Sequence, residues 1–216
     1  MSRARSTILT CWALAALASA CGSSTKPSAS SASGVGTSTA GGESTPQGGA
    51  GAAAGALAAE ANSAATGDIP DTQVFLTYRN AAGGYSMSYP EGWAIKGNGA
   101  GVTISERNNL LHVVIEKAGP PSVASVGNEL AHLKRTNPSL AFSAPTVMRV
   151  ASGMAVKATY TTRSAPNPVT GKTVLLVVDR YELGKGDKRA TVDLGTPRGV
   201  DNVDAYRMII NSFRWQ

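Results

Sequence analysis

The chain has 216 residues, a formal net charge of +6 and only 6% aromatic residues. Its basic residues are scattered along the sequence and are not interleaved with aromatic residues, which argues against a nucleic-acid-binding protein. The two cysteines, Cys11 and Cys21, both lie near the N-terminus. The rest of the chain therefore contains no internal disulfide, and its stability must come from packing.

The first twenty residues have the layout of a secretory signal peptide. Arg3 and Arg5 precede an apolar stretch at residues 7–17, which is followed by small residues at 18–20. A positively charged start, a short apolar region and a small-residue cleavage site are the three parts of such a signal. The apolar stretch is shorter than the ~20 residues that span a bilayer. We therefore expect residues 1–20 to be a signal peptide.

Residues 17–22 resemble the bacterial lipobox, in which the cysteine is lipidated and becomes the first residue of the mature protein. The resemblance implies that Cys21 carries acyl chains such as palmitate and anchors the protein on the extracytoplasmic face of a bacterial plasma membrane. Two alternatives remain. Residues 18–20 also suit ordinary signal peptidase, which would release a secreted protein with a free Cys21. An uncleaved anchor is the other alternative.

A low-complexity segment follows the predicted cleavage site. Residues 22–67 are rich in Gly, Ser, Ala and Thr, and Leu57 is their one large aliphatic residue apart from Val35. Such a composition buries too little apolar surface to offset the entropy of ordering the chain. We expect residues 21–67 to be the lipidated cysteine and a disordered tether. At ~5–6 Å × √n, the tether would let a domain move roughly 40 Å from its anchor.

Residues 68–216 carry nearly all the large apolar residues and have the size of one domain. Apolar alternation between turn residues predicts strands near 73–78, 85–89, 93–95, 102–104, 110–115, 146–150, 155–162, 174–183 and 190–194. Consecutive strands that are joined by short turns pair antiparallel.

Two helices are expected among these strands. Ser122 is placed to cap a helix over residues 123–135, and Asp201 to cap a helix that ends the chain. The second helix would bury one apolar face, made of Val203, Tyr206, Ile210 and Phe213. We therefore predict an α+β domain with an antiparallel β-sheet of about six or seven strands packed against two main helices.

Two stretches resemble the PsbP-like family, which is named for an extrinsic subunit of photosystem II. The opening motif lies at residues 84–93, and the ending combines residues 179–181, 190–194 and 206–215. The resemblance implies a fold shared with a Ran-binding nuclear-import factor and with actinobacterial LpqN-type lipoproteins. It implies a binding or scaffolding module and brings no catalytic residues. The matching aromatic residues are expected in the core: Tyr89, Trp93, Phe213 and Trp215.

Motifs for nucleotide or hydrolytic chemistry are incomplete. Residues 166–173 end like a phosphate-binding loop, but Pro166 replaces the first glycine and Pro168 has no N–H to donate. A strand follows where a helix would be needed, so we expect a hairpin turn. Ser86 and Ser88 do not lie in a nucleophile motif and form the polar side of a strand.

The two histidines are also expected to be structural. His132 follows Glu129 by three residues, which is half of a carboxylate-bridged metal site, but no second such pair exists. His112 shares a strand face with Leu110 and Val114, which favours a half-buried, hydrogen-bonded histidine over a catalytic base. We therefore predict no metal, no cofactor and no enzymatic activity.

The leading functional hypothesis is a membrane-tethered, monomeric binding or assembly module for an envelope protein. The basic turn with Lys185, Lys188 and Arg189 is its candidate partner-binding face, because charged loop tips steer association. The alternatives are a carrier of a lipid or small apolar ligand, and an envelope hydrolase. An enclosed apolar cavity would favour the carrier, and a polar cleft around His112 would favour the hydrolase.

Overall fold

The computed structural model describes Gly55, residues 67–167 and residues 169–216. The predicted signal peptide, Cys21 and almost all of the predicted tether lie outside the described residues. Among the helices of the described part, none has the length and apolar character needed to cross a membrane.

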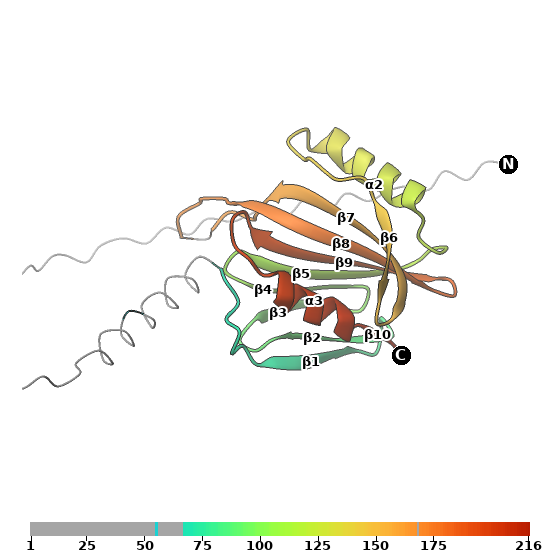
Figure 1. Cartoon of the computed structure of the whole chain (residues 1–216), viewed down its shortest axis with the longest axis horizontal. Coiled ribbons are helices and arrows are strands. Elements are labelled where there is room, and N and C mark those ends of the chain that lie inside the picture. Colours follow the sequence, from blue (N-terminus) through green and yellow to red (C-terminus); the bar gives the residue numbers. More distant parts are fainter. Residues whose placement is uncertain (1–54, 56–66, 168) are drawn as a thin grey trace, which may run out of the picture. The chain divides into compact units, whose positions relative to one another are not determined.

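The strands of the described residues form two antiparallel sheets (Figure 1). The larger sheet has seven strands in the order β3-β4-β5-β9-β8-β7-β6, and the smaller has the order β1-β2-β10. Their bounds are β1 Phe75–Asn80, β2 Tyr85–Pro90, β3 Ala94–Asn98, β4 Gly101–Glu106, β5 Asn109–Lys117, β6 Thr146–Val150, β7 Gly153–Arg163, β8 Leu175–Lys185, β9 Lys188–Pro197 and β10 Arg214–Trp215. The predicted α+β fold is confirmed. The smaller sheet is an addition that the sequence did not indicate.

Each face of the larger sheet has its own apolar core. Successive side chains of a strand point to opposite faces, and in β5 Leu111 and Val113 face one side while His112 faces the other. Leu111 and Val113 belong to the core that contains helix α3, Val203–Ser212. A separate core contains helix α2, Val123–Thr136. We call the two sides the α3 face and the α2 face.

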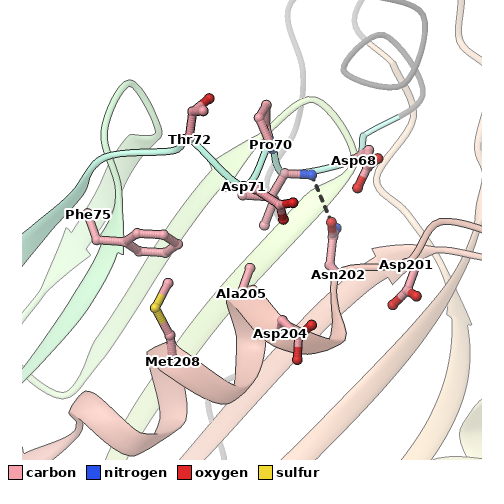
Figure 2. Close-up of a pocket in the computed structure, with 11 residues that line it drawn as sticks. Asp68, Pro70, Asp71, Thr72, Phe75, Asp201, Asn202, Asp204, Ala205 and Met208 are labelled. Atoms are coloured by element: carbon pink, nitrogen blue, oxygen red, sulfur yellow. Dashed lines mark hydrogen bonds between the residues drawn. The ribbon is translucent and has the colours of Figure 1, made fainter. Parts of the chain in front are cut away.

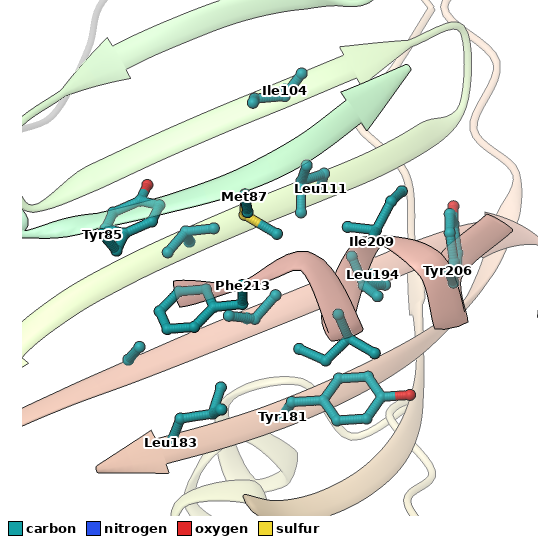
Figure 3. Packing of buried hydrophobic residues seen from close by; sticks show 14 of the residues in the cluster. Tyr85, Met87, Ile104, Leu111, Tyr181, Leu183, Leu194, Tyr206, Ile209 and Phe213 are labelled. Atoms are coloured by element: carbon teal, nitrogen blue, oxygen red, sulfur yellow. The ribbon is translucent and has the colours of Figure 1, made fainter. Parts of the chain in front are cut away.

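The core of the α3 face joins the larger sheet, the smaller sheet and α3 (Figure 3). Phe213 stacks on Tyr85 with ring centroids 5.4 Å apart, and Trp215 meets Phe213 edge-on at 5.2 Å. Phe213 and Trp93 are buried as predicted. Tyr89 and Trp215 are only half-buried and pack at the margin of this core.

Helix α2 lies across the other face and begins as predicted. The Ser122 side chain accepts a hydrogen bond from the Ser125 backbone N–H, and the Ser125 side chain accepts one from the Ser122 N–H. This reciprocal capping satisfies two backbone donors that a helix leaves free. Val126 and Leu130 are buried against the sheet.

Helix α3 differs from the prediction at its first turn. Its cap residue is Asn202 and not Asp201, and the buried Asn202 side chain makes no capping hydrogen bond but binds the segment that precedes β1. Asn202 Oδ1 accepts from the Ile69 N–H at 2.8 Å, and Asn202 Nδ2 donates to the Gly67 carbonyl at 3.0 Å. Asp201 instead accepts from the Val203 N–H at 3.2 Å. The expected burial of Val203 is wrong, since 60% of its surface is exposed.

Candidate functional site

An open groove of about 600 Å³ runs between α3 and strands β6, β7, β8 and β9. Helix α3 does not cover this part of the α3 face. Side chains of the helix and of the sheet therefore line the groove. The helix contributes Val203, Tyr206, Arg207, Ile210 and Asn211, and the sheet contributes Met148, Arg149, Val150, Lys157, Val177, Asp179, Tyr181, Leu194 and Thr196. This size lies within the range that binding sites for small ligands occupy.

Most of the groove lining is apolar, with one ion pair set into it. Lys157 Nζ lies 2.7 Å from Asp179 Oδ2, and Thr159 Oγ1 donates to Asp179 Oδ1 at 2.6 Å. Lys157 Nζ also lies 5.3 Å from the centroid of the Tyr181 ring, a cation–π distance. The ion pair crosses from β7 to β8, because Lys157 and Thr159 are neighbours of Tyr181 and Asp179 in the register.

Protonation in the groove suits binding better than proton transfer. Burial is the largest single effect and would lower the pKa of Lys157, but the hydrogen bond with Asp179 and the interactions with Tyr181 and the Asp179 charge together leave this pKa raised. Burial also raises the pKa of the Tyr181 hydroxyl, against the opposing charge of Lys157. Both groups therefore keep their protons near neutral pH, whereas a general base must release its proton there.

On the α2 face, ion pairs join the helix to the sheet. Arg189 Nη2 lies 2.8 Å from Glu129 Oε1 on α2, and Arg189 also contacts Glu116 and the buried Glu182. Burial, together with the nearby charge of Glu129, raises the pKa of Glu182 to about 7, against opposing effects of Thr191 and Arg189. We call Arg189, Glu116, Glu129 and Glu182 the Arg189 cluster.

The structure separates the three predicted partner-binding residues. Lys185 and Lys188 are exposed and face each other across the β8–β9 hairpin. Lys185 Nζ donates to the Gln216 carbonyl at 3.3 Å. The Arg189 side chain is only 13% exposed and points into its cluster of carboxylates. The cationic tip therefore consists of the two lysines without Arg189.

His112 lies beside an acid that is already engaged. Its Nδ1 is 4.0 Å from Asp193 Oδ2, beyond hydrogen-bonding distance. Arg180 donates to both Asp193 oxygens, at 2.8 and 2.7 Å. Burial would raise the pKa of Asp193, but these hydrogen bonds hold it below its usual value. The Asp193 carboxylate is thus oriented by Arg180, and it does not orient His112 as a catalytic acid orients its base.

Glu129 and His132, whose spacing is that of half a carboxylate-bridged metal site, have separate partners in the structure. His132 is exposed, and its Nδ1 lies 2.8 Å from an Arg135 guanidinium nitrogen. The Glu129 carboxylate binds Arg189 instead. Within residues 67–167 and 169–216, no group of three or more His, Cys, Asp or Glu side chains is arranged to hold a metal ion.

The segment that ends like a phosphate-binding loop connects β7 and β8. Asn167 Oδ1 accepts from the backbone N–H groups of Val169 and Thr170, both at 2.9 Å. The Gly171 N–H donates to the Asn167 carbonyl at 2.8 Å. The loop thus directs these backbone donors to its own oxygen atoms, and a strand follows it, as predicted for a hairpin turn.

A second cleft lies at the start of α3, on the side away from the groove (Figure 2). Four carboxylates line it, from Asp68, Asp71, Asp201 and Asp204. The Ile69–Asn202 hydrogen bond crosses its floor. In this cleft, the segment that precedes β1 is bonded to Asn202 at the start of α3.

Sequence reasoning missed the groove residues of β7 and β8. A signal was present, because Lys157, Thr159 and Thr161 alternate with Val156, Ala158 and Tyr160. Such alternation shows that one face of β7 is in contact with water. It does not show that a helix from the end of the chain runs beside that face, which is what turns it into a groove.

No protein-family model matches the chain, and no curated protein sequence matches it. Among solved structures, cyanobacterial PsbP from Synechocystis is similar, with 16% identity and a TM-score of 0.49 over 69% of this chain and 98% of that one. The Ran-binding protein Mog1p of Saccharomyces cerevisiae has 11% identity and a TM-score of 0.45, over 66% and 95%. A Bacteroides thetaiotaomicron protein has 14% identity and a TM-score of 0.40, over 65% and 48%. These similarities concern the fold alone.

Proposed function

We propose that the chain is a non-catalytic binding module, tethered outside the plasma membrane, that docks a segment of an envelope protein in the groove beside α3. The observation that carries the proposal is the groove itself. It is open, mostly apolar, and built from two rigid elements, a helix and a sheet. Rigid walls suit binding, because little conformational freedom is then lost when a partner docks.

The ionisable groups of the described residues support a binding function over a catalytic one. Lys157 and Asp179 neutralise each other within the groove. On the other face, Asp193 is committed to Arg180, and Glu129 is committed to Arg189. A hydrolase would need a base in contact with a nucleophile, and these acids are instead engaged in holding strands and a helix together.

The N-terminal sequence supports the location. A lipidated Cys21 would hold the domain near the membrane, and a tether raises the local concentration of the domain around membrane partners without adding any contact. The exposed Lys185 and Lys188 would assist the first encounter with an acidic partner, since exposed charges change association rates more than affinity.

A carrier of a lipid or small apolar ligand is the second candidate. The apolar lining of the groove favours it, with Val177, Leu194 and Ile210 among the lining residues. Mass spectrometry of solvent extracts of the purified protein separates the two functions. If the extracts contain a stoichiometric lipid, and this lipid is absent from variants with an altered groove, the carrier function is favoured over the binding module.

In-cell cross-linking of the full chain tests the proposal. Val203→Asp places a charge at the groove rim and suits the first turn of a helix, where acidic residues are favourable. Met208→Asp is the matched control, since Met208 is also exposed on α3 but does not line the groove. We expect Val203→Asp to reduce cross-linking to an envelope protein and Met208→Asp to leave it unchanged. Equal cross-linking by both variants, or turnover of an ester, glycan or peptide that His112→Ala abolishes, would contradict the proposal.

A further inference from the structure

Strand β6 is an edge of the larger sheet and pairs with β7 alone. Val150 and Gly153 form the pair that closes the β6–β7 hairpin. In an antiparallel ladder, residues alternate between those that bond to the neighbouring strand and those whose N–H and C=O point away from it. Counting back from the closing pair, Val147 and Arg149 direct their backbone groups away from β7. This edge therefore offers donors and acceptors to another chain.

The groove reaches this same edge. Three consecutive β6 residues line it, namely Met148, Arg149 and Val150. Met148 and Val150 share the face of the strand that borders the groove, and the Arg149 side chain lies on the other face, so the groove runs along β6. Asn211 on α3 closes one end, where its Oδ1 accepts from the Ala151 N–H at 3.1 Å. A chain added to β6 would therefore lie beside the groove.

The charges around the groove favour an acidic occupant. Arg149, Lys157 and Arg207 line it, against Asp179 as the only acid of the lining set. Lys157 is neutralised by Asp179, and Arg207 pairs with Asp204, which is exposed to solvent. Within the described part of the chain, Arg149 forms no ion pair. An acidic side chain on the added strand would be its first partner.

We propose that β6 accepts an extended segment of the partner protein as an additional strand, with apolar side chains at alternate positions in the groove and an acidic residue beside Arg149. In this mode of recognition, main-chain hydrogen bonds supply affinity and pockets for alternate side chains supply specificity. The inference rests on the proposed function, because it says how the binding module holds its partner.

A second copy of this chain fits the edge less well. If two β6 strands paired with each other, Arg149 of both copies would enter one interface, and the sequence of β6 contains no acidic residue to pair with them. The exposed Val147, with 57% of its surface in contact with water, adds an apolar contact for an extended partner on the outer side of the strand.

Proline substitution separates edge pairing from other modes of binding. Val147→Pro removes one outward N–H and no bond to β7, so the fold should tolerate it, as edge strands tolerate proline. Val147→Thr keeps the N–H and changes only the side chain. Ile95→Pro is the matched control on the opposite edge strand, β3, where Ile95 is 42% exposed and also directs its N–H outward.

The probes are twelve-residue peptides selected from a random phage-displayed library on the full chain. We expect selected peptides to alternate apolar residues and to carry an acidic residue. Val147→Pro should weaken their binding about tenfold or more, as for the loss of one main-chain hydrogen bond. Val147→Thr and Ile95→Pro should stay within about twofold, and Arg149→Glu should also weaken binding. Hydrogen exchange of the bound protein should show protection at Val147 and Arg149.

Other results would overturn the inference. These are selected peptides that bind Val147→Pro as tightly as the unaltered chain, a library that yields no binding peptide, and a dimer of the chain that Val147→Pro dissociates. In each case, strand addition to β6 is contradicted. The proposed binding function still holds if Val203→Asp abolishes the cross-link in cells. If peptide binding does not depend on the β6 edge and the cross-link in cells does not depend on Val203, the proposed function is contradicted as well.

Discussion

The two faces of the seven-stranded sheet are covered by one helix each, but by different chemistry. On the α3 face, aromatic and aliphatic side chains from two sheets and the helix form a continuous core. On the α2 face, a smaller apolar core is extended by the Arg189 cluster and by the Arg180–Asp193 pair. The difference separates two sources of stability. Apolar burial is indifferent to pH, whereas a cluster of buried carboxylates is not.

Phe213→Ala should have the largest effect, because it removes the centre of the α3-face core. The ring is fully buried and touches both Tyr85 and Trp215. Truncating a buried phenylalanine lowers the free energy of unfolding by ~3–5 kcal/mol. Urea denaturation would measure this loss. Met208→Ala, on the exposed side of the same helix, should change it by less than about 0.5 kcal/mol. Similar losses for the two variants would show that α3 is peripheral.

Glu182→Gln should expose the pH dependence of the α2 face. In the folded protein, burial raises the pKa of Glu182 from 4.5 to about 7. The unfolded chain therefore releases this proton at lower pH, and the free energy of unfolding falls as pH rises between these two values. The slope for one such group is about 1.4 kcal/mol per pH unit.

Thermal or urea unfolding at pH 5 and pH 8 measures this contribution. Because glutamine does not ionise, the variant should gain stability relative to the unaltered chain by ~2–3 kcal/mol between these pH values. A stability difference that stays constant from pH 5 to pH 8 would show that Glu182 is ionised throughout this range, held by Arg189.

Ser122→Ala should loosen α2 by a smaller amount. The substitution removes the hydrogen bond that the Ser125 N–H donates to the Ser122 hydroxyl oxygen, and leaves that donor to water. Loss of such a cap costs ~0.5–2 kcal/mol. Hydrogen exchange should accelerate in the first turn of α2 while α3 keeps its protection. Equal acceleration in both helices would mean that the two faces do not open independently.

Reversal of the two hairpin lysines should have the smallest effect on stability. Lys185→Glu and Lys188→Glu change exposed side chains, and such substitutions usually alter stability by no more than about 0.5 kcal/mol. If the hairpin steers a partner, capture in cells should become slower and less sensitive to salt. Unchanged capture would remove Lys185 and Lys188 from the partner-binding face.

Local signals in the sequence predicted much of the fold. The alternation in β5 and β6, the Ser122 cap and the turn between β7 and β8 all depend on neighbouring residues, and the structure agrees with each. The second sheet was not predictable in this way. Its third strand is the pair Arg214–Trp215, which is too short to show any period and joins β2 across most of the domain sequence.

The candidate site was less predictable than the fold. Arg189 follows two lysines in the sequence, which suggested a single basic tip, but its side chain turns to Glu129, sixty residues earlier. The groove depends on where α3 lies across the sheet, and the helical pattern alone placed Val203 in the core. Distant contacts of this kind leave no trace in local composition or periodicity.

The fastening of Gly67 determines where mechanical tension would enter the domain. The Gly67 carbonyl accepts from Asn109 Nδ2 at 2.7 Å and from Asn202 Nδ2 at 3.0 Å. Asn109 begins the inner strand β5 of the larger sheet, and Asn202 precedes α3. A pull on the chain at Gly67 therefore reaches an inner strand of the larger sheet and the start of α3 before it reaches β1. The force is shared between the side-chain amides of Asn109 and Asn202. The edge strand β1 is therefore protected from being pulled away from β2.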